Sequence, residues 1–396
     1  MLFRSRILGE MEWQGAKVNR DVLKTMETVF EQEIEETAER IYYYAGEEFN
    51  IGSPKQLGEI LFEKMGFKSK KKTKTGYSTA QPVLEAMVDI HPIFPELLNY
   101  RMLTKLQSTY LKGLQSQIFS DGKIHTIYLQ TLTQTGRLSS IDPNLQNIPV
   151  RTSEGKKIRY AFEPSLDYLV SFDYSQIELR ILAHVAHVDG LIKAFNEDKD
   201  IHRHTAALVF GIDDDQVTDQ MRTQAKAVNF GIIYGMSNFR LANDVGMSMK
   251  QAKQFIERYF KTYPEIAAYM DDIVESCKEN GYVSTVLNRK RYIPTINDSN
   301  RTVREQAKRY AMNAPIQGSG ADIMKLSMIK VDDILKEHHF KSKLILQVHD
   351  ELIFDVAADE LEELMVVVKD AMEHCFTMDV PLKADCHYGK TWGDLK

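Results

Sequence analysis

The chain has 396 residues, of which 43% are hydrophobic and 27% charged, and its formal net charge is −6 at pH 7. These values are ordinary for a globular protein of two or three packed units, and they neither indicate nor exclude a nucleic acid partner. No apolar run is long enough to span a membrane or to act as a signal peptide, and three cysteines make neither a disulfide framework nor a zinc site. We therefore expect a cytoplasmic, reducing setting.

The first third of the chain predicts a mostly helical unit. Apolar residues recur at helical spacing over residues 21–48, which indicates a long amphipathic helix. The stretch Ser53–Gln56 (SPKQ) predicts a second helix start with a capping box. Further helices are expected over residues 80–90 and 94–117.

Five lysines follow the second expected helix: Lys68, Lys70, Lys71, Lys72 and Lys74. A lysine run is often only a solvated loop. The alternative is a flexible basic loop that contacts a phosphate backbone. The sequence leaves both interpretations open.

The middle of the chain changes pattern at Lys123. Residues 124–131 (IHTIYLQT) alternate like a β-strand, and Tyr168–Phe172 predicts another strand that leads directly into an acidic residue. Residues 191–309 are expected to be helical, apart from a hairpin over residues 281–294.

Two short apolar runs, Leu344–Val348 and Leu352–Val356, have the length and composition of buried strands. The polar residues His349, Asp350 and Glu351 lie between them, and they lack the glycine or asparagine that favours a tight turn. The tip of this hairpin is therefore either an acidic exposed turn or a place where acids are held for chemistry.

Asp173 is the partner expected for Asp350. Each aspartate lies where an apolar, strand-like run ends, so both fit at one edge of the same sheet. Two carboxylates brought together repel each other unless they share a cation. Magnesium takes a few hard oxygen ligands and completes its shell with water and substrate phosphates. Two such ions lower the pKa of an attacking hydroxyl and stabilise a leaving pyrophosphate. The sequence alone does not show that the two acids meet.

The stretch 222–234 (RTQAKAVNFGIIY) is more specific. Arg222, Lys226, Phe230 and Tyr234 fall at steps of four, so a helix places them along one slowly drifting stripe about 12 Å long between the lysine and the tyrosine. Cations at one end suit a triphosphate, and aromatic rings at the other suit a sugar and base. A structural helix with solvated cations is the alternative, and it explains the aromatic end less well.

Long polar donors form a third group: Arg137, Asn144, Gln146, Asn147, Arg309, Asn313 and Gln317. Such donors suit the minor groove of a duplex, where similar acceptors on every base pair report pair geometry rather than sequence. Ordinary surface residues are the alternative. Arg309, Asn313 and Gln317 are spaced four residues apart, as on one face of a helix. Pro315 lies between them and disfavours an uninterrupted helix, which weakens the case for a shared face.

Six stretches occur in a set order: TGRLSSIDPNLQNIP (135–149), DYSQIELR (173–180), DIHRHTA (200–206), RTQAKAVNFGIIYG (222–235), MNAPIQGSGADI (312–323) and QVHDEL (347–352). Together they resemble the family A DNA polymerases, most closely the large (Klenow-like) fragment of the bacterial members. The similarity also includes the lysine loop and KLQSTY (105–110), and so covers nearly the whole chain.

The resemblance implies an α+β, right-hand polymerase fold with a helical thumb, an antiparallel-sheet palm and helical fingers. The implied ranges are a lead-in at 1–19, the thumb at 20–122, the palm at 123–190 and 310–396, and the fingers at 191–309. Bacterial relatives carry nuclease domains ahead of this region, and no stretch here would house an exonuclease. We therefore expect no proofreading domain, as in a shortened or a naturally exonuclease-free form.

The resemblance also implies roles for the matching residues. Asp173 and Asp350 would bind two Mg²⁺ ions, with the carbonyl of Tyr174 assisting. Glu351 would support this site. Glu178 would block a ribose 2′-hydroxyl and so select deoxynucleotides.

Other matching residues would contact the nucleotide: Gln176, Glu178, His202, Arg222, Lys226, Phe230 and Tyr234. Lys226 is also a candidate acid for the pyrophosphate, Phe230 would lie against the sugar and base, and Tyr234 would guard the templating position. In the family, phenylalanine at this site goes with poor use of dideoxynucleotides. The primer–template would contact Arg137, Asn144, Gln146, Asn147, Arg309, Asn313, Gln317 and His349.

The implied function is DNA-templated DNA synthesis from deoxynucleoside triphosphates, by a monomer with no membrane partner. A single-subunit RNA polymerase shares the two-aspartate site, but Glu178 and the lack of a promoter-binding extension argue against it. A catalytically silent DNA-binding scaffold is a further alternative. The presence of both aspartates together with Arg222 and Lys226 argues against that alternative.

Overall fold

The computed structural model describes residues 2–68, 72–73, 76–149 and 152–395. Two compact units are formed, a larger unit from residues 1–14, 128–141 and 166–388, and a smaller unit from residues 15–127, 142–165 and 389–396. Among the described residues, no helix is both long and apolar enough to cross a bilayer.

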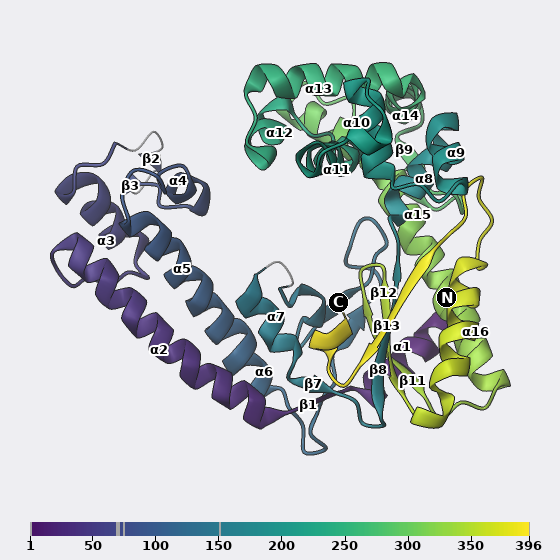
Figure 1. Cartoon of the computed structure of the whole chain (residues 1–396), viewed down its shortest axis with the longest axis horizontal. Helices are drawn as coiled ribbons and strands as arrows, with labels where there is room; N and C mark the ends of the chain where they lie inside the picture. The colour runs from purple at the N-terminus through teal and green to yellow at the C-terminus, as the bar shows by residue number, and fades with distance from the viewer. Residues whose placement is uncertain (1, 69–71, 74–75, 150–151, 396) are drawn as a thin grey trace. The chain divides into compact units, whose positions relative to one another are not determined.

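A four-stranded sheet lies at the centre of the larger unit (Figure 1). Its order is β11 (Lys343–Val348), β12 (Glu351–Val356), β8 (Tyr168–Tyr174) and β13 (Ala384–Gly389), and β12 pairs antiparallel with both of its neighbours. Every residue of β12 is buried. This accounts for its apolar sequence, because a central strand covered on both faces has no solvent side to carry polar residues.

Helices cover the sheet and share its core. They are α1 (Leu2–Gln14), α8 (Ile177–Val185), α15 (Arg301–Glu337) and α16 (Leu361–Glu373). Phe172 of β8 and Phe354 of β12 meet edge to face at 5.4 Å, within an apolar cluster that also holds Met328 of α15 and Val368 of α16.

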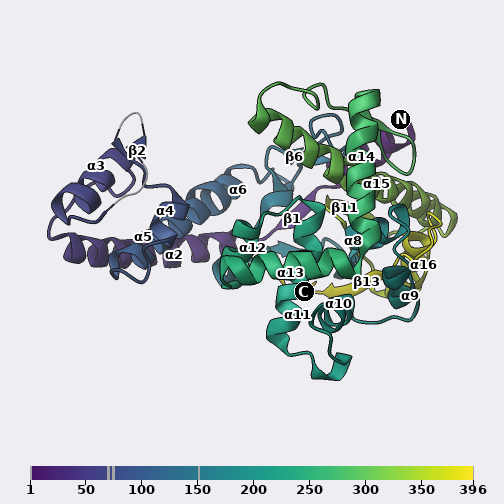
Figure 2. The ribbon, with the colours of Figure 1, turned by 90° about the horizontal axis from the view of Figure 1, so that it is seen from above.

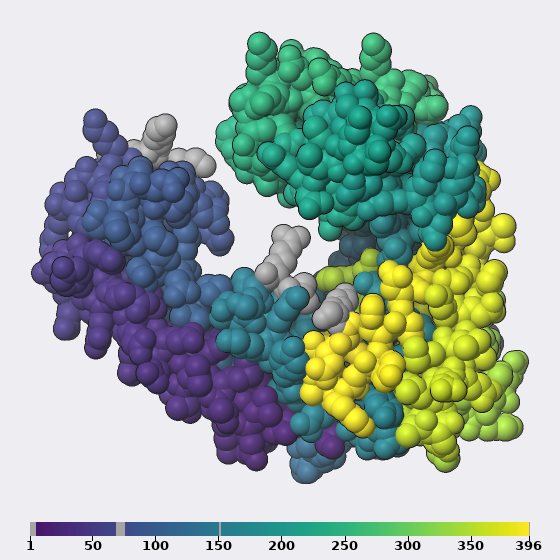
Figure 3. Space-filling view, viewed as in Figure 1, coloured from purple at the N-terminus to yellow at the C-terminus, as the bar shows by residue number. Residues whose placement is uncertain are grey.

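The remaining helices of the larger unit extend the same core: α9 (Asp189–Asn196), α10 (Ile201–Phe210), α11 (Asp219–Ile233), α12 (Asn238–Val245), α13 (Met249–Thr262) and α14 (Pro264–Asn280). Figure 3 shows α10 to α14 as one continuous body of side chains. A hairpin of β9 (Tyr282–Ser284) and β10 (Lys290–Tyr292) follows α14, and α14 runs beside α15 (Figure 2).

The smaller unit is mainly helical. Its helices are α2 (Arg20–Ala45), α3 (Pro54–Glu59), α4 (Gln81–Glu85), α5 (Ile93–Lys105), α6 (Gly113–Ser116) and α7 (Ser153–Arg159), with π-helical turns at Ile60–Lys64 and Leu106–Lys112. Its strands are β1 (Ala16–Val18), β4 (Lys123–Ile124) and β7 (Phe162–Glu163), which form one sheet, and the pair β2 (Lys72–Thr73) and β3 (Gly76–Tyr77).

Three local expectations need correction. The strand expected at 124–131 is two short strands, β4 and β5 (Ile127–Leu129), because β4 pairs with β1 while β5 pairs with β6 (Ser139–Ile141). The helix expected at 80–90 ends at Glu85.

The capping box expected at Ser53 does not form. Ser53 Oγ caps the helix by accepting from the Gln56 backbone N–H. Oε1 of Gln56 instead accepts from the backbone N–H of Asn50 at 2.8 Å. The central part of the lysine loop, Lys70, Lys71 and Lys74, lies outside the described residues.

Candidate active site

The two central strands of the sheet bring the predicted acids together. Asp173 of β8 lies directly opposite Glu351 of β12, and the backbone N–H of Tyr174 donates to the Asp350 carbonyl at 3.0 Å. Directly opposed residues project to the same face of an antiparallel pair. Asp173 and Asp350 are half-buried, whereas Glu351 is only 2% exposed. The sheet thus sets three carboxylates at one end of β8 and β12.

His349 and Asp350 form the two-residue turn between β11 and β12, because Val348 and Glu351 are paired in register. His349 takes a φ of +56°, in the left-handed region that costs a non-glycine residue energy. Its carbonyl accepts from Nε2 of Gln347 at 2.6 Å. The absence of glycine in the sequence therefore corresponds to backbone strain at the tip that carries Asp350.

The donor set at this end of the sheet suits magnesium. In the part of the chain that the structure describes, no group of three or more His, Cys, Asp or Glu residues is arranged to hold a metal ion. Asp173, Asp350 and the carbonyl of Tyr174 supply hard oxygen donors only. Magnesium accepts such a small protein set because water and phosphate oxygens complete its octahedron. Zinc and the softer transition metals prefer imidazole or thiolate ligands, which are not predicted here.

The side chain of Tyr174 anchors β8 from the opposite face. Its phenol donates to the Met372 carbonyl at 2.7 Å and makes a second hydrogen bond with Ser327. Burial raises the pKa of this phenol. The side chain is therefore occupied in the core, and the carbonyl is the only part of Tyr174 that fits the predicted metal role.

Helix α11 carries the predicted basic and aromatic stripe. Thr218 caps its N-terminus by accepting from the Met221 backbone N–H. The buried face of α11 consists of apolar residues with one polar exception, and it includes Ala225, Val228, Asn229, Ile232 and Ile233. The stripe lies on the other side, with Lys226 and Tyr234 exposed and Arg222 and Phe230 half-buried. The helical expectation for 222–234 is confirmed, with Tyr234 at the C-cap.

His202 faces the middle of this stripe from α10. Its ring lies 5.6 Å from that of Phe230, and Nδ1 lies 3.1 Å from Nδ2 of Asn229. Burial lowers the pKa of His202 to about 4, with Lys226 and Arg222 adding to the decrease. The imidazole is therefore neutral at pH 7. Because an amide nitrogen only donates, Nδ1 accepts and the ring proton lies on Nε2.

Arg222 is already paired in this structure. Its Nε donates to Oδ2 of Asp200 at 2.7 Å, and the other oxygen of Asp200 caps α10 through the His202 and Arg203 backbone N–H groups. Lys226 remains exposed beside this pair. Asp200 thus connects the N-terminus of α10, which carries His202, to the cation on α11.

Glu178 connects three segments of the larger unit. It is 7% exposed, and its Oε1 accepts from Nη2 of Arg137 at 2.8 Å while its Oε2 accepts from the Tyr234 phenol at 2.8 Å. Gln317 also hydrogen-bonds Tyr234. Burial, followed by the charge of Glu178, raises the pKa of Tyr234 to about 12. The predicted sugar gate, template guard and two primer–template contacts thus meet in one cluster.

Helix α15 continues through Pro315, so Arg309, Asn313 and Gln317 do share one helix. Nδ2 of Asn313 donates to the Ile233 carbonyl at 3.3 Å, which ties α15 to the end of α11. Pro315 does not end α15. Neighbouring elements bury this part of the helix, and their packing outweighs the loss of the backbone N–H at the proline.

The remaining predicted residues are divided between the units. Arg137 and His349 line one small cavity of the larger unit. Gln176 precedes α8 with a φ of +53°. The last three lie in the smaller unit, on or beside a 3₁₀ turn: Asn144, Gln146 and Asn147.

Sequence reasoning missed Asp200 and Asn229 as parts of this site. Asn229 had a readable signal, because it is a polar residue on the apolar face of an amphipathic helix, and a buried amide needs partners. Asp200 carried no comparable signal, because an aspartate just before a helix is also an ordinary N-cap residue.

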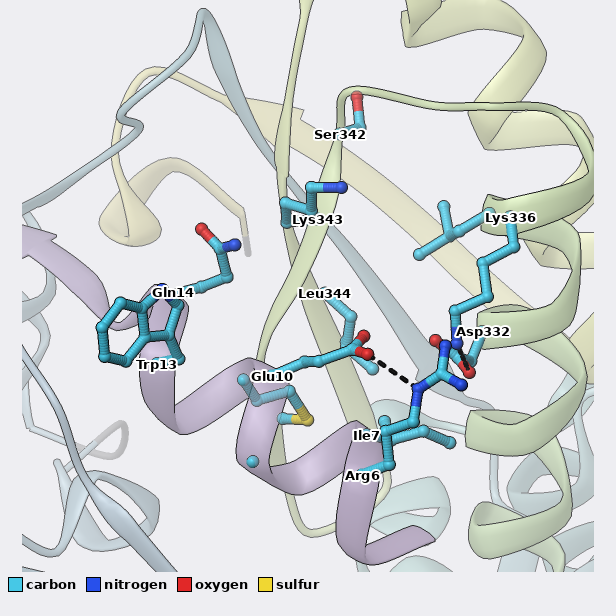
Figure 4. Close-up of a pocket in the computed structure, with 13 residues that line it drawn as sticks. Arg6, Ile7, Glu10, Trp13, Gln14, Asp332, Lys336, Ser342, Lys343 and Leu344 are labelled. Atoms are coloured by element: carbon cyan, nitrogen blue, oxygen red, sulfur yellow. Dashed lines mark hydrogen bonds and ion pairs between the residues drawn. The ribbon is translucent and has the colours of Figure 1, made fainter. Parts of the chain in front are cut away.

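Two larger cavities are lined by none of the predicted site residues. One, of about 520 Å³, lies among α1, α15 and β11, where Arg6 and Glu10 pair at 3.0 Å and Trp13 is exposed (Figure 4). The other, of about 660 Å³, lies in the smaller unit beside Tyr77 and Arg101. The candidate site is therefore the sheet end and the α11 stripe, not a closed cavity.

Comparison with known proteins identifies the family. The family described as "DNA polymerase family A" matches residues 20–394. The chain belongs to DNA polymerase family A. The resemblance carried by the six motifs is thereby confirmed.

Curated proteins named DNA polymerase I are similar along almost the whole chain. DNA polymerase I of Lactococcus lactis subsp. lactis (strain IL1403) is 53% identical over 394 residues, which are 99% of this chain and 45% of that protein. DNA polymerase I of Bacillus subtilis (strain 168) is 52% identical over 393 residues, which are 98% and 45% respectively. The chain thus spans about half the length of the curated relatives it matches.

A solved structure shares the fold. It is described as the POL domain of Pol1 from M. smegmatis in complex with DNA primer-template and dNTP. Its sequence is 43% identical, the match covers 100% of this chain and 70% of that one, and the TM-score is 0.95. The expected α+β, right-hand polymerase fold is confirmed. The assignment of residue ranges to thumb, palm and fingers stays a prediction, and α15 runs across the expected boundary at 309/310.

Proposed function

We propose that this chain is a DNA-directed DNA polymerase that extends a primer by one deoxynucleotide at a time. The primer 3′ oxygen forms a bond to the α-phosphorus as the bond from that phosphorus to the β-phosphate oxygen breaks. The 3′-hydroxyl proton is lost and pyrophosphate leaves. The observation that carries this proposal is the placing of Asp173 and Asp350 on adjacent strand ends, in a member of family A.

The carboxylates of Asp173 and Asp350 and the carbonyl of Tyr174 would hold two magnesium ions. When bound, these ions lower the pKa of the 3′-hydroxyl and offset charge on the leaving pyrophosphate. Glu351 lies opposite Asp173 and is buried, so it supports the position of that aspartate rather than reaching solvent.

The α11 stripe would bind the incoming nucleotide. Lys226 and Arg222 supply charge to the triphosphate, and neutral His202 donates from Nε2 without adding a third charge. Lys226 is the candidate acid that protonates the pyrophosphate. Phe230 would lie against sugar and base, next to the imidazole it already contacts.

Glu178 would exclude a ribose 2′-hydroxyl. Its carboxylate is buried and accepts from Arg137, so that contact holds it in place against a larger sugar even when Tyr234 has moved away. Tyr234 would occupy the templating position until the fingers close, and Gln176 would line the same nucleotide pocket.

The residues that would contact the primer–template are Arg137, Asn144, Gln146, Asn147, Arg309, Asn313, Gln317 and His349. We further propose that the chain acts as a monomer in the cytoplasm. We also propose that these 396 residues carry no proofreading activity. Loss of a mismatched 3′ nucleotide from a labelled primer, without added nucleotides, would refute the last point.

Primer extension with deoxy- or ribonucleotides, with and without magnesium, tests the proposal. The wild type is expected to extend only with deoxynucleotides and magnesium, and Asp173→Asn to be slower by about 10³-fold. Asp355→Asn is the matched control, because this carboxylate lies on the same strand pair but accepts from the Leu166 N–H at 2.9 Å. The control is expected to retain extension at a temperature where it remains folded.

Each contrary outcome points to one alternative. Equal extension by Asp173→Asn would refute the two-metal assignment. A preference for ribonucleotides would favour an RNA polymerase. Magnesium-independent duplex binding without any extension would favour the scaffold.

A further inference from the structure

Arg289 lies at the turn of the β9–β10 hairpin and joins three segments of the larger unit. Its Nε donates to Oδ1 of Asp322 at 2.8 Å. Its Nη2 donates to the carbonyl of Thr135 at 2.7 Å and to the carbonyl of Gly318 at 3.0 Å. One planar guanidinium therefore connects the hairpin, the loop that carries residues 135–137 and the middle of α15.

Two glycines leave room for this guanidinium. A Cβ on Gly136 would lie 2.6 Å from Cζ of Arg289, and a Cβ on Gly318 would lie 2.9 Å from its Nη2 and 2.6 Å from Cγ2 of Thr285. Contacts this short do not occur for real side chains, so any residue larger than glycine displaces the arginine. The guanidinium therefore packs against the backbone at Gly136 and at Gly318, where no side chain intervenes.

Asp322 fixes the orientation of Arg289. Its side chain is 5% exposed, so its charge must be compensated. Oδ2 accepts from the Thr285 hydroxyl at 2.7 Å, and Oδ1 accepts from Arg289 and, at 3.3 Å, from Lys325. Because both oxygens have partners, the carboxylate has little freedom to rotate, and the Arg289 fork is held in one plane.

The segments that Arg289 joins carry two proposed primer–template contacts. Arg137 directly follows Gly136, and Gln317 directly precedes Gly318. Both side chains reach the Glu178–Tyr234 pair, one through Glu178 and one through Tyr234. Small changes in the spacing of the two backbones would therefore move both donors relative to one base pair.

We propose that Arg289 is a positioning residue that sets the spacing between Arg137 and Gln317, so that both donors check the same primer-terminal base pair. This inference rests on the proposed polymerase function. Two donors held at a fixed separation fit the minor-groove acceptors of a matched pair, and a displaced acceptor in a mispair loses one of them. Arg289 touches neither the nucleotide nor the DNA, and acts only through its neighbours.

The test compares extension of matched and mismatched primer termini by the wild type, Arg289→Met and Arg289→Lys. A lysine keeps the charge but cannot donate to Asp322, Thr135 and Gly318 together. We expect kcat on the matched primer to fall about tenfold, as for the loss of a charge-assisted hydrogen bond. KM for the nucleotide and the rate on the mismatched primer should not change, so discrimination falls by the same factor.

Arg304→Lys is the matched control. Arg304 lies on α15, the helix that carries Gly318 and Asp322, and like Arg289 it donates to two backbone carbonyls, those of Asp298 at 2.7 Å and Ser299 at 3.3 Å. In the part of the chain that the structure describes, Arg304 makes no hydrogen bond to the Thr135–Arg137 segment, so Arg304→Lys should keep wild-type discrimination. If Arg289→Met does not fold, the comparison of Arg289→Lys with Arg304→Lys tests the proposal. Both variants are then assayed at a temperature at which their thermal unfolding curves show that they are folded.

A second readout needs no catalysis. The dissociation constant for the mismatched duplex divided by that for the matched duplex, measured by fluorescence anisotropy, should fall in Arg289→Met and stay unchanged in Arg304→Lys. Equal losses on both primers, or an unchanged binding ratio, would show a purely structural role and overturn the inference. Wild-type protein that discriminates in binding but does not extend would overturn the proposed function instead.

Discussion

The phenol of Tyr234 donates a 2.8 Å hydrogen bond to Oε2 of Glu178, while Nη2 of Arg137 takes the other oxygen at the same distance. The proposed template guard and the proposed sugar gate are thus hydrogen-bonded to each other in this conformation. If Tyr234 must leave this position when a nucleotide binds, that hydrogen bond is broken at every cycle.

Removing the Tyr234 hydroxyl should therefore favour nucleotide binding. We expect Tyr234→Phe to lower KM for the correct deoxynucleotide by two- to tenfold, which corresponds to about 0.5–1.5 kcal/mol for one hydrogen bond, with kcat unchanged. Steady-state kinetics measure this effect. Tyr292→Phe, at a tyrosine that is 70% exposed, is the control. An unchanged KM in Tyr234→Phe would show that the bond persists during nucleotide binding.

The neutral state of His202 predicts a pH dependence of stability. Its pKa is about 4 in the folded chain and about 6.5 when unfolded, because burial disfavours the charged ring. Between these values the unfolded chain binds a proton that the folded chain does not. The free energy of unfolding therefore decreases as pH falls from 6.5 to 4, and this contribution is constant below pH 4.

Urea unfolding at several pH values between 7.5 and 4 checks this expectation. His202→Gln should show a shallower decrease than the wild type, because it has no proton to gain. Thr205→Val is the matched control, since Thr205 lies in the same buried cluster, 3.3 Å from Asn229, but does not titrate. It should lower stability equally at every pH. Parallel curves for wild type and His202→Gln would contradict the prediction.

The left-handed backbone of His349 predicts which residues the β11–β12 turn accepts. Asparagine adopts this conformation readily, so His349→Asn should leave thermal stability unchanged. Valine is β-branched and should lower it by about 1–3 kcal/mol. Calorimetry of both variants measures the difference, and each variant serves as the other's control. Equal unfolding temperatures would show that the turn relaxes to a different conformation.

Strands and helices with strong local signals were predictable from sequence. The apolar runs of β11 and β12 were visible because both faces of these strands are buried, and the α11 stripe was visible because a helix repeats every 3.6 residues. The turn at His349 and Asp350 was expected at the right place because these polar residues interrupt the two apolar runs that form β11 and β12.

What failed depended on partners distant in sequence. The stretch 124–131 alternates like one strand, but its two halves pair with different sheets. The capping box at Ser53 is the exception and failed for a local reason, because Oε1 of Gln56 accepts from the backbone N–H of Asn50, six residues away, instead of from that of Ser53. No local pattern shows that Arg137 meets Glu178, or that Arg289 meets Thr135 and Gly318, since these contacts join residues 29 to 154 positions apart.

The register of β8 against β12 makes the site intolerant of small insertions and deletions. A single residue added to Leu352–Val356 would turn every following side chain to the opposite face, because side chains alternate along a strand. It would also displace Glu351 from Asp173 or uncouple Asp350 from Tyr174. Length changes in this strand should thus abolish folding and chemistry together. In a scan of single-residue insertions and deletions, variants with changes in β12 should therefore be lost equally under selection for expression and under selection for activity.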